Sequence, residues 1–244
     1  MSSTVPRWKS AIEEGLAKFP NQTVVQIATL EQNISGGIIP RVRSHVVRSF
    51  LTNPTTPGLS LIVSTTDTRT PKVHQLTLDA HVEATWWLEG KKQQFRLAGK
   101  AYVFPAPSHT ILCAHFKAAL KDAPSGSALA EFREFGWEEG RLRTFRALSP
   151  GMRASWARPT PPPGSLLKDG TEEWPKKLEE PKEGQEGYEK AKELWDLALS
   201  RFSLVVIDPD EVDLVDLATD PDTRTRFTKK EGAVGVWEET ALVP

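Results

Sequence analysis

The segments RVRSHVVR at 41–48, TDTRTPK at 66–72 and QQFRLAG at 93–99 decide how this chain is interpreted. The first and third alternate polar or charged residues with apolar ones, a pattern typical of half-buried strands. The second combines Thr, Asp, Arg and Pro and is typical of a turn after a strand. Each segment places cationic or hydrogen-bonding side chains on a strand or just after one. We expect these side chains to form a cradle for a doubly charged phosphate and a flat polar ring.

Strand patterns recur around these segments. Short runs rich in β-branched and aromatic residues, bounded by turn residues, predict strands at 23–30, 41–51, 59–65, 82–88 and 93–104. The turn residues at 89–92 predict that the last two strands form a hairpin. Several short strands close together in sequence indicate a small antiparallel barrel or sandwich.

The C-terminal part of the chain returns to strand patterns. The sequence DPDE at 208–211 separates two β-branched runs, 202–207 and 212–217, and predicts a hairpin. Edge strands are expected at 224–228 and 234–238. The chain is therefore predicted to be a single domain, 1–244.

The segment at about 105–200 differs from its flanks. Helical spacing of apolar residues predicts helices at 109–121, 127–148 and 187–200, besides an N-terminal helix at 5–19. The proline-rich run 158–164 must be extended, because each proline restricts φ and removes an amide donor. The charged run 168–187 is expected to be a surface loop. We interpret about 105–200 as a helical and proline-rich insertion between two groups of strands.

Composition limits the function classes. The chain has 244 residues and a formal net charge of −1, which argues against general binding to nucleic acid or to a membrane surface. Its one cysteine, Cys113, excludes an intramolecular disulfide and a cysteine-based zinc cluster. The sequence has neither a membrane-spanning apolar run nor a secretory signal pattern, so we expect a cytoplasmic protein. No catalytic or metal-binding signature stands out.

A local anion site is the main functional hypothesis. Arg69, Thr70 and Lys72 lie within four residues of one turn, and Arg43 could add a charge from a neighbouring strand. Gln94 offers both donors and an acceptor for the edge of a heteroaromatic ring. The alternative is that these are ordinary solvated side chains in turns and on strand faces.

The order and spacing of several motifs resemble a known family. They are Pro40, Arg43, Arg48 and Phe50; Thr66, Asp67, Arg69, Thr70 and Lys72; Gln94, Arg96 and Gly99; the LSP sequence at 148–150 with Arg153; the PPPG sequence at 161–164; and the segment 208–214. In these features the chain resembles the pyridoxamine 5′-phosphate oxidase-like flavoproteins, which are split-barrel FMN binders. More narrowly, it resembles their fungal and cyanobacterial branch.

The resemblance implies a mainly β (α+β) fold, a split β-barrel of the FMN-binding type with peripheral helices, and FMN as cofactor. It implies that Arg69, Thr70 and Lys72 hold the FMN phosphate, with Ser64 near the preceding strand end. It also implies a homodimer with the flavin at the interface, so that two copies share each site. The other implied contacts are Arg43, Ser44, His45 and Val46 along the ribityl chain and flavin, Gln94 at the isoalloxazine ring, and Arg226 from the last strands.

The chain departs from the oxidases of this family at the substrate end. Those enzymes carry a Trp on the late hairpin and an Arg-x-His cluster, whereas this chain has Leu214 and the sequence RTR at 224–226. All five histidines lie in the first half of the chain. His45 alone lies among the expected flavin contacts, as a packed side chain or as a proton donor.

Three functions remain open at this point. The first is an FMN-dependent oxidoreductase with an altered substrate end and an unknown small-molecule substrate. The second is a non-catalytic protein of the same fold that binds FMN or another ligand. The third is an interaction protein that uses its helical and proline-rich insertion. A likeness of fold does not choose among them.

Overall fold

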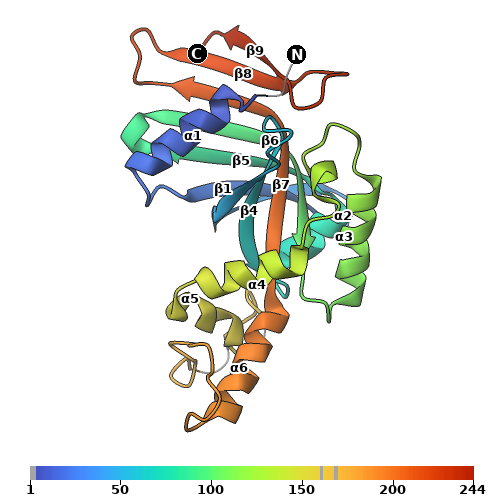
Figure 1. The fold of residues 1–244 in the computed structure, drawn as a ribbon, viewed down its shortest axis with the longest axis vertical. Coiled ribbons are helices and arrows are strands. Elements are labelled where there is room, and N and C mark those ends of the chain that lie inside the picture. The colour runs from blue at the N-terminus through green and yellow to red at the C-terminus, as the bar shows by residue number, and fades with distance from the viewer. Residues whose placement is uncertain (1–3, 160–161, 168–169) are drawn as a thin grey trace.

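Strand β7 (Phe202–Asp216) organises the sheet of this molecule (Figure 1). The computed structural model describes residues 4–159, 162–167 and 170–244. In it β7 pairs with β6 (Gln93–Phe104) over most of its length, with β4 (Ser60–Asp67) over its first part, and with β8 (Thr223–Lys229) over its last part. All three pairings are antiparallel. This strand therefore connects the two halves of a nine-stranded sheet.

The other strands extend the sheet on both sides of β7. Beyond β6 lie β5 (His81–Leu88), β1 (Val24–Gln32) and β2 (Ile38–Val46), in that order. Beyond β4 lies β3 (Ser49–Thr52), and β9 (Trp237–Leu242) pairs with β8. The predicted hairpin of β5 and β6 is confirmed, with the 3₁₀ turn η1 (Glu89–Lys91) between its strands.

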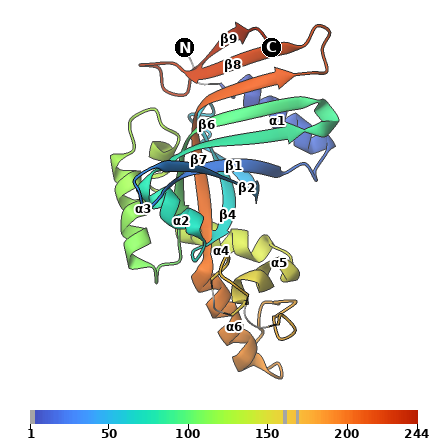
Figure 2. The same cartoon turned by 180° about the vertical axis from the view of Figure 1, so that it is seen from behind.

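Helices cover parts of the sheet and form a lobe at one end of it (Figures 1 and 2). The α-helices are α1 (Arg7–Lys18), α2 (Pro71–Leu78), α3 (Thr110–Asp122), α4 (Trp137–Ala147), α5 (Pro150–Ala154) and α6 (Tyr188–Arg201), and the remaining 3₁₀ turns are η2 (Leu129–Phe132) and η3 (Ser155–Ala157). The lobe contains α4, α5 and α6, and α6 leads directly into β7. The helices from α3 to α6 lie between β6 and β7, where the insertion was predicted. A mainly β fold with peripheral helices is thus confirmed.

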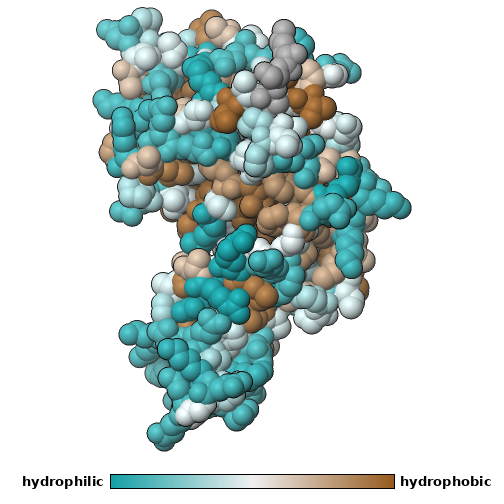
Figure 3. Space-filling view, in the orientation of Figure 1, coloured by the Kyte–Doolittle hydropathy of each residue, from teal (hydrophilic) through white to brown (hydrophobic). Residues whose placement is uncertain are grey.

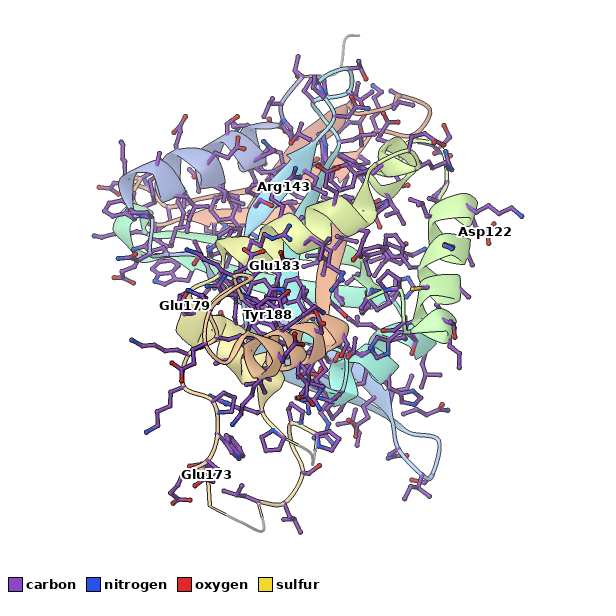
Figure 4. All side chains as sticks on the ribbon, turned by 60° about the horizontal axis from the view of Figure 1, so that its bottom comes forward. Asp122, Arg143, Glu173, Glu179, Glu183 and Tyr188 are labelled. Atoms are coloured by element: carbon purple, nitrogen blue, oxygen red, sulfur yellow. The ribbon has the colours of Figure 1, made fainter. Side chains whose placement is uncertain are left out.

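The long loop before α6 leaves this lobe and returns to it. Figure 4 shows Glu173 on the outer part of the loop and Tyr188 on α6. The return is fixed at Leu178, whose side chain is buried and whose amide donates to Pro150 O at 3.0 Å. Thr160 and Pro161, part of the proline-rich run, and residues 168–169 of the predicted loop lie outside the described residues.

Two hydrophobic cores lie on opposite faces of the central strands. Successive side chains of a strand point to opposite faces, so a strand covered on both faces is apolar at nearly every position. On β4, Ile62 enters the core under α1, whereas Leu61 and Val63 enter the core under the insertion helices. On β7, Val205 and Val206 divide in the same way. Burial on both faces makes β4 and β7 rigid supports for what lies at their ends.

The predicted hairpin at 202–217 is wrong, because β7 is one continuous strand of 15 residues. A β-bulge accommodates the turn-like sequence, with the register shifting between Ala98 and Gly99 on the neighbouring β6. Pro209 has no amide hydrogen and is tolerated at such an irregular position. Buried Asp208 is satisfied by Lys229 Nζ at 2.7 Å and by the amide of Leu129 at 2.9 Å. Tertiary partners therefore straighten a sequence that is typical of a turn.

Three other local predictions are corrected. The strand expected at 41–51 is divided, because Val47 N donates to Thr23 O beside β1 while Arg48 N donates to Val63 O on β4. The helix expected at 127–148 is divided into η2 and α4. The turn expected at 66–72 is shorter than predicted, because α2 begins within it at Pro71. Thr70 at the N-cap and proline at the first helical position are a regular helix start.

No helix in the described part of the chain has both the length and the apolar character needed to cross a membrane.

Gly99 permits the close approach of β6 to the bulge in β7. A Cβ at this position would lie 2.2 Å from Asp208 O and 2.8 Å from Pro209 Cα. We therefore expect Gly99→Ala to lower the free energy of unfolding by about 3 kcal/mol or more, measured by urea denaturation. Gly151→Ala is the control, because the nearest atom to its Cβ, Lys176 O, is 3.7 Å away. Equal stabilities of the two variants would contradict this account of the bulge.

Candidate functional site

A cavity of about 490 Å³ lies where the end of β4 meets the insertion. One wall comes from β2, the end of β4 and the turn that leads into α2; the other comes from α5, η3 and the following loop. A cavity of this size is typical of sites for small molecules and cofactors. Of the predicted site residues, those that line the cavity are Ser44, His45, Val46, Arg69, Thr70 and Lys72.

The pairing of β4 with β7 positions the turn that carries Arg69 and Lys72. Asp67, the last residue of β4, pairs with Phe202, the first residue of β7. Just beyond this pair, Thr68 N donates to Arg201 O at 2.8 Å. The chain then enters α2, so Thr70 and Lys72 lie at a helix N-terminus, which favours negatively charged ligands.

Arg201 also attaches the insertion to this turn. Its Nη1 donates to Trp156 O at 3.2 Å and to Arg158 O at 2.5 Å. The indole nitrogen of buried Trp156 donates to Thr66 O on β4 at 3.1 Å. These bonds hold the two walls of the cavity at a defined separation.

Among the described residues that line the cavity, the charged ones are four cations and one carboxylate, although the whole chain has a formal net charge of −1. They are Arg48, Arg69, Lys72, Arg158 and Asp67. Arg69 binds Asp67 with both Nε and Nη2, at distances from 2.7 to 3.2 Å, and both side chains are largely buried. One of these cations is therefore neutralised, and the described lining of the cavity remains cationic.

Two of these cations, Lys72 and Arg48, have no side-chain partner in the described ranges. Neither side chain makes a hydrogen bond or ion pair with any residue that the structure describes, and Arg48 Nε is fully buried. Burial lowers the pKa of Lys72, Arg43 lowers it further, and Asp67 partly opposes them. Burial also lowers the pKa of Arg48. Desolvated cations without a counter-ion are costly, and an anionic ligand would supply the missing partner.

Two other predicted contacts are already engaged within the protein. Thr70 Oγ1 donates to Asp67 O at 2.8 Å, so this hydroxyl hydrogen is not available to an anion. Ser64 is fully buried beneath the cavity, where its Oγ donates to Val46 O at 3.0 Å and lies 3.1 Å from His45 Nδ1. Ser64 thus supports the cavity wall and does not line it.

His45 is a neutral member of the cationic wall. The pKa of this imidazole is lowered to about 3, chiefly by burial and then by the charges of Lys72 and Arg43. His45 is 6% exposed and lines the cavity. Near neutral pH it therefore offers a polar group without charge.

Arg43, Gln94 and Arg226 do not line this cavity. The guanidinium of Arg43 donates to Thr29 and, at 2.6 Å, to Gln75 Oε1. Gln94 alternates along β6 with Phe95, whose side chain lies in the barrel core, so Gln94 faces outward. Arg226 lies 3.3 Å from Glu211 and 3.6 Å from Asp213 in a cluster on the outer sheet face. Within one chain these residues and the cavity are separate.

Some residues of the site have no role predicted from the sequence, and only the structure shows that they belong there. Arg48 was noted in a motif only, and its unpartnered state becomes visible only in three dimensions. Trp156, Arg158 and Trp174 come from the insertion, with the Arg158 guanidinium 5.2 Å from the centre of the Trp174 ring. These residues are far from the turn at 66–72 in sequence, so no local pattern indicates that they share a cavity with it.

The cavity fits a ligand that has an anionic group and a ring. Lys72 and Arg48, which have no partner among the described residues, provide donors for the anion. Val46, Met152 and Trp156 provide apolar surface in the same cavity. FMN has both parts, a phosphate and a flat heterocycle, so the residues present fit this cofactor.

Comparison with known proteins agrees with the fold and with the family resemblance. Residues 5–105 match the family described as pyridoxamine 5′-phosphate oxidase, FMN-binding domain. A search of curated protein sequences gave no significant match. The narrower assignment to a fungal and cyanobacterial branch stays a prediction.

Two solved structures share the fold over nearly the whole chain. A pyridoxamine 5′-phosphate oxidase-related, FMN-binding protein from Nostoc punctiforme is 20% identical, with a TM-score of 0.66, over 99% of this chain and 100% of that one. PhzG from Burkholderia lata, solved with tetrahydrophenazine-1-carboxylic acid, is 16% identical, with a TM-score of 0.56, over 97% of this chain and 92% of that one. The split-barrel fold class is therefore confirmed. The chain therefore shares the fold of these proteins, and its residues 5–105 are similar to the FMN-binding domain of the pyridoxamine 5′-phosphate oxidase family.

Proposed function

We propose that this chain is a flavoprotein that holds FMN in the cavity between β4 and the insertion. The observation that carries the proposal is the pair of desolvated cations, Lys72 and Arg48, which line one cavity and have no partner among the described residues. The family match supports FMN as the ligand with the required charge. Bound FMN would supply a ring that accepts and returns electrons, while the protein supplies binding, orientation and electrostatics.

The phosphate would be held chiefly by Lys72, with Arg69 beside it. The Lys72 ammonium donates to no residue that the structure describes, and Lys72 lies in the first turn of α2. Arg69 keeps unused N–H groups on a guanidinium whose orientation is held by Asp67. Asp67 therefore positions the arginine and also reduces the net charge of the site.

A homodimer would complete this site. Gln94 and Arg226 lie on the outer sheet face and not at the cavity of their own chain, so the family-based contact with flavin requires them from a second copy. Hydrophobic side chains gather in the middle of the face shown in Figure 3, above the largely hydrophilic lower lobe. A gathered apolar patch of this kind is typical of an interaction surface. Both observations support a dimer with shared flavin sites.

The proposed activity is that of an FMN-dependent oxidoreductase in which the segment that binds the substrate is altered relative to the family's oxidases. The segment that carries an Arg-x-His cluster in the family's oxidases has Arg224 and Arg226 here, and both face Asp213. Arg224 binds this carboxylate at 2.8 Å. These arginines are engaged within the protein, which supports a substrate other than a vitamin B6 phosphate. The same engagement of the two arginines equally supports the second candidate, a protein that binds FMN without catalysis.

The visible absorbance spectrum of the purified protein, together with mass identification of the released ligand, tests the proposal. A flavin spectrum and released FMN support it, and a colourless protein that does not bind added FMN overturns it. Hydrogen peroxide release with pyridoxine 5′-phosphate would identify an oxidase of the B6 type. Bleaching by a nicotinamide donor would identify a reductase, whereas a bound flavin inert to these donors would favour the non-catalytic candidate.

Removing the two turn cations is expected to weaken FMN binding. Each charge-assisted contact contributes about 1.5–3 kcal/mol, so Arg69→Ala combined with Lys72→Ala should raise the Kd for FMN well over tenfold. Quenching of flavin fluorescence measures the Kd, and riboflavin, which lacks the phosphate, should be affected much less. The control combines Lys117→Ala with Arg143→Ala, two exposed positions outside the cavity (Arg143 is labelled in Figure 4). An unchanged Kd for FMN would contradict the phosphate assignment.

Lys72 is expected to reduce the stability of the ligand-free protein. The pKa of Lys72 is lower in the folded state than in the unfolded state. Below the folded-state pKa the charged ammonium therefore reduces the free energy of unfolding, and this loss disappears as the pH rises from the folded-state pKa to the unfolded-state pKa. We expect Lys72→Met to raise the free energy of unfolding at pH 7 by ~1 kcal/mol, which raises the Tm of a chain of this size by about 2–4 °C. The effect should be smaller at alkaline pH. Lys117→Met is the exposed control and should change the Tm little. Destabilisation by Lys72→Met would show that this ammonium has a partner.

A further inference from the structure

His45 differs from the other polar groups of the cavity because its hydrogen bonds define one tautomer. The residue lies on β2 opposite Val25 of β1, and 6% of its surface is exposed. Its Nδ1 lies 3.1 Å from Ser64 Oγ, and Ser64 Oγ lies 3.0 Å from Val46 O. These three groups form a short chain beneath the cavity wall.

Counting hydrogens along this chain identifies the donor at each contact. Val46 O is a carbonyl and can only accept, so the single hydroxyl hydrogen of Ser64 is donated to it. Ser64 Oγ must then accept from His45, which requires the hydrogen of the neutral imidazole to be on Nδ1. His45 Nε2 is therefore without a hydrogen and carries a lone pair.

This lone pair is open to the cavity. Nε2 has no hydrogen-bond partner among the described residues, and it is not one of the fully buried side-chain atoms that lack a partner. Lys72 and Arg43 are the charged groups that act on the imidazole, and both disfavour a second proton. The site thus combines a free ammonium, from Lys72, with a neutral acceptor.

We propose that His45 Nε2 accepts a hydrogen bond from a ligand hydroxyl next to the phosphate, so that the cavity recognises a phosphorylated polyol chain. This inference rests on the proposed function, in which that chain is the ribityl phosphate of FMN. The hydroxyl would lie close to the phosphate because His45 and Lys72, whose ammonium would hold the phosphate, line the same cavity. The sequence-based hypothesis of His45 as a proton donor is replaced, because the neutral imidazole uses its hydrogen on Ser64.

The tautomer can be tested in the ligand-free protein by nitrogen-15 NMR of the histidine side chains. We expect His45 to be neutral at pH 7, with a protonated Nδ1 and an unprotonated Nε2. Signals lost in His45→Val assign the residue, and His81→Val, which removes an exposed histidine, is the matched control. A hydrogen on Nε2 at pH 7 overturns the inference and leaves the proposed function untouched.

Recognition of the hydroxyls is tested with two flavin phosphates. One is FMN, and the other carries the phosphate on an alkyl chain without hydroxyls. We expect the wild-type protein to bind FMN more tightly by roughly three- to tenfold, the effect of about one hydrogen bond. His45→Val should remove most of this preference, and His45→Gln, whose side-chain oxygen can accept, should restore part of it.

The outcomes separate this inference from the function on which it rests. An equal preference for FMN in the wild-type protein and in His45→Val overturns the role of His45, while FMN binding stands. Wild-type protein that binds neither flavin phosphate overturns the proposed function together with this use of His45. Riboflavin binding and the Tm of each variant show whether it has kept its fold, and His45→Gln provides the decisive comparison if His45→Val does not fold.

Discussion

The antiparallel pairing of Asp67 with Phe202 is the contact on which the rest of the site depends. It joins the end of β4 to the start of β7, and therefore places the end of α6 beside the turn that carries Arg69 and Lys72. Arg201, the last residue of α6, accepts from Thr68 and donates to the carbonyls of Trp156 and Arg158. One strand pairing thus sets the distance between both walls of the cavity. Because β4 and β7 are buried on both faces, the arrangement is rigid.

Electrostatics gives this rigid cavity its chemical character. The protein pairs Arg69 with Asp67 but leaves Lys72 and Arg48 without a partner in the part of the chain that the structure describes, at a cost to its own stability. Such an arrangement is typical of a binding site, where a ligand supplies the missing charge. Burial, together with the charges of Lys72 and Arg43, lowers the pKa of His45 and keeps it neutral. Charge recognition and hydroxyl recognition are therefore two consequences of one cluster of side chains.

Local patterns predicted most of the strands, and they failed where tertiary contacts outweigh local preference. The sequence DPDE at 208–211 has turn chemistry, yet it lies within β7 because Lys229 and Leu129 bind Asp208, and because Gly99 lets β6 approach the bulge. The division at Val47 and Arg48 likewise arises from two different strand partners. In both places the deciding partner is far away in sequence, so no local pattern could have indicated it.

The sequence by itself determined the mainly β character, the position of the insertion and the cationic turn at 66–72, because these depend on residue periodicity and on residues close together in the chain. Its motifs also indicated the family. Only the tertiary structure decided that Arg48, Trp156 and Arg158 share a cavity with Lys72, that Arg69 is engaged by Asp67, and that Gln94 and Arg226 face elsewhere. The physical reason is that pairing, burial and the absence of a partner are relations between distant segments, which exist only once the strands have assembled.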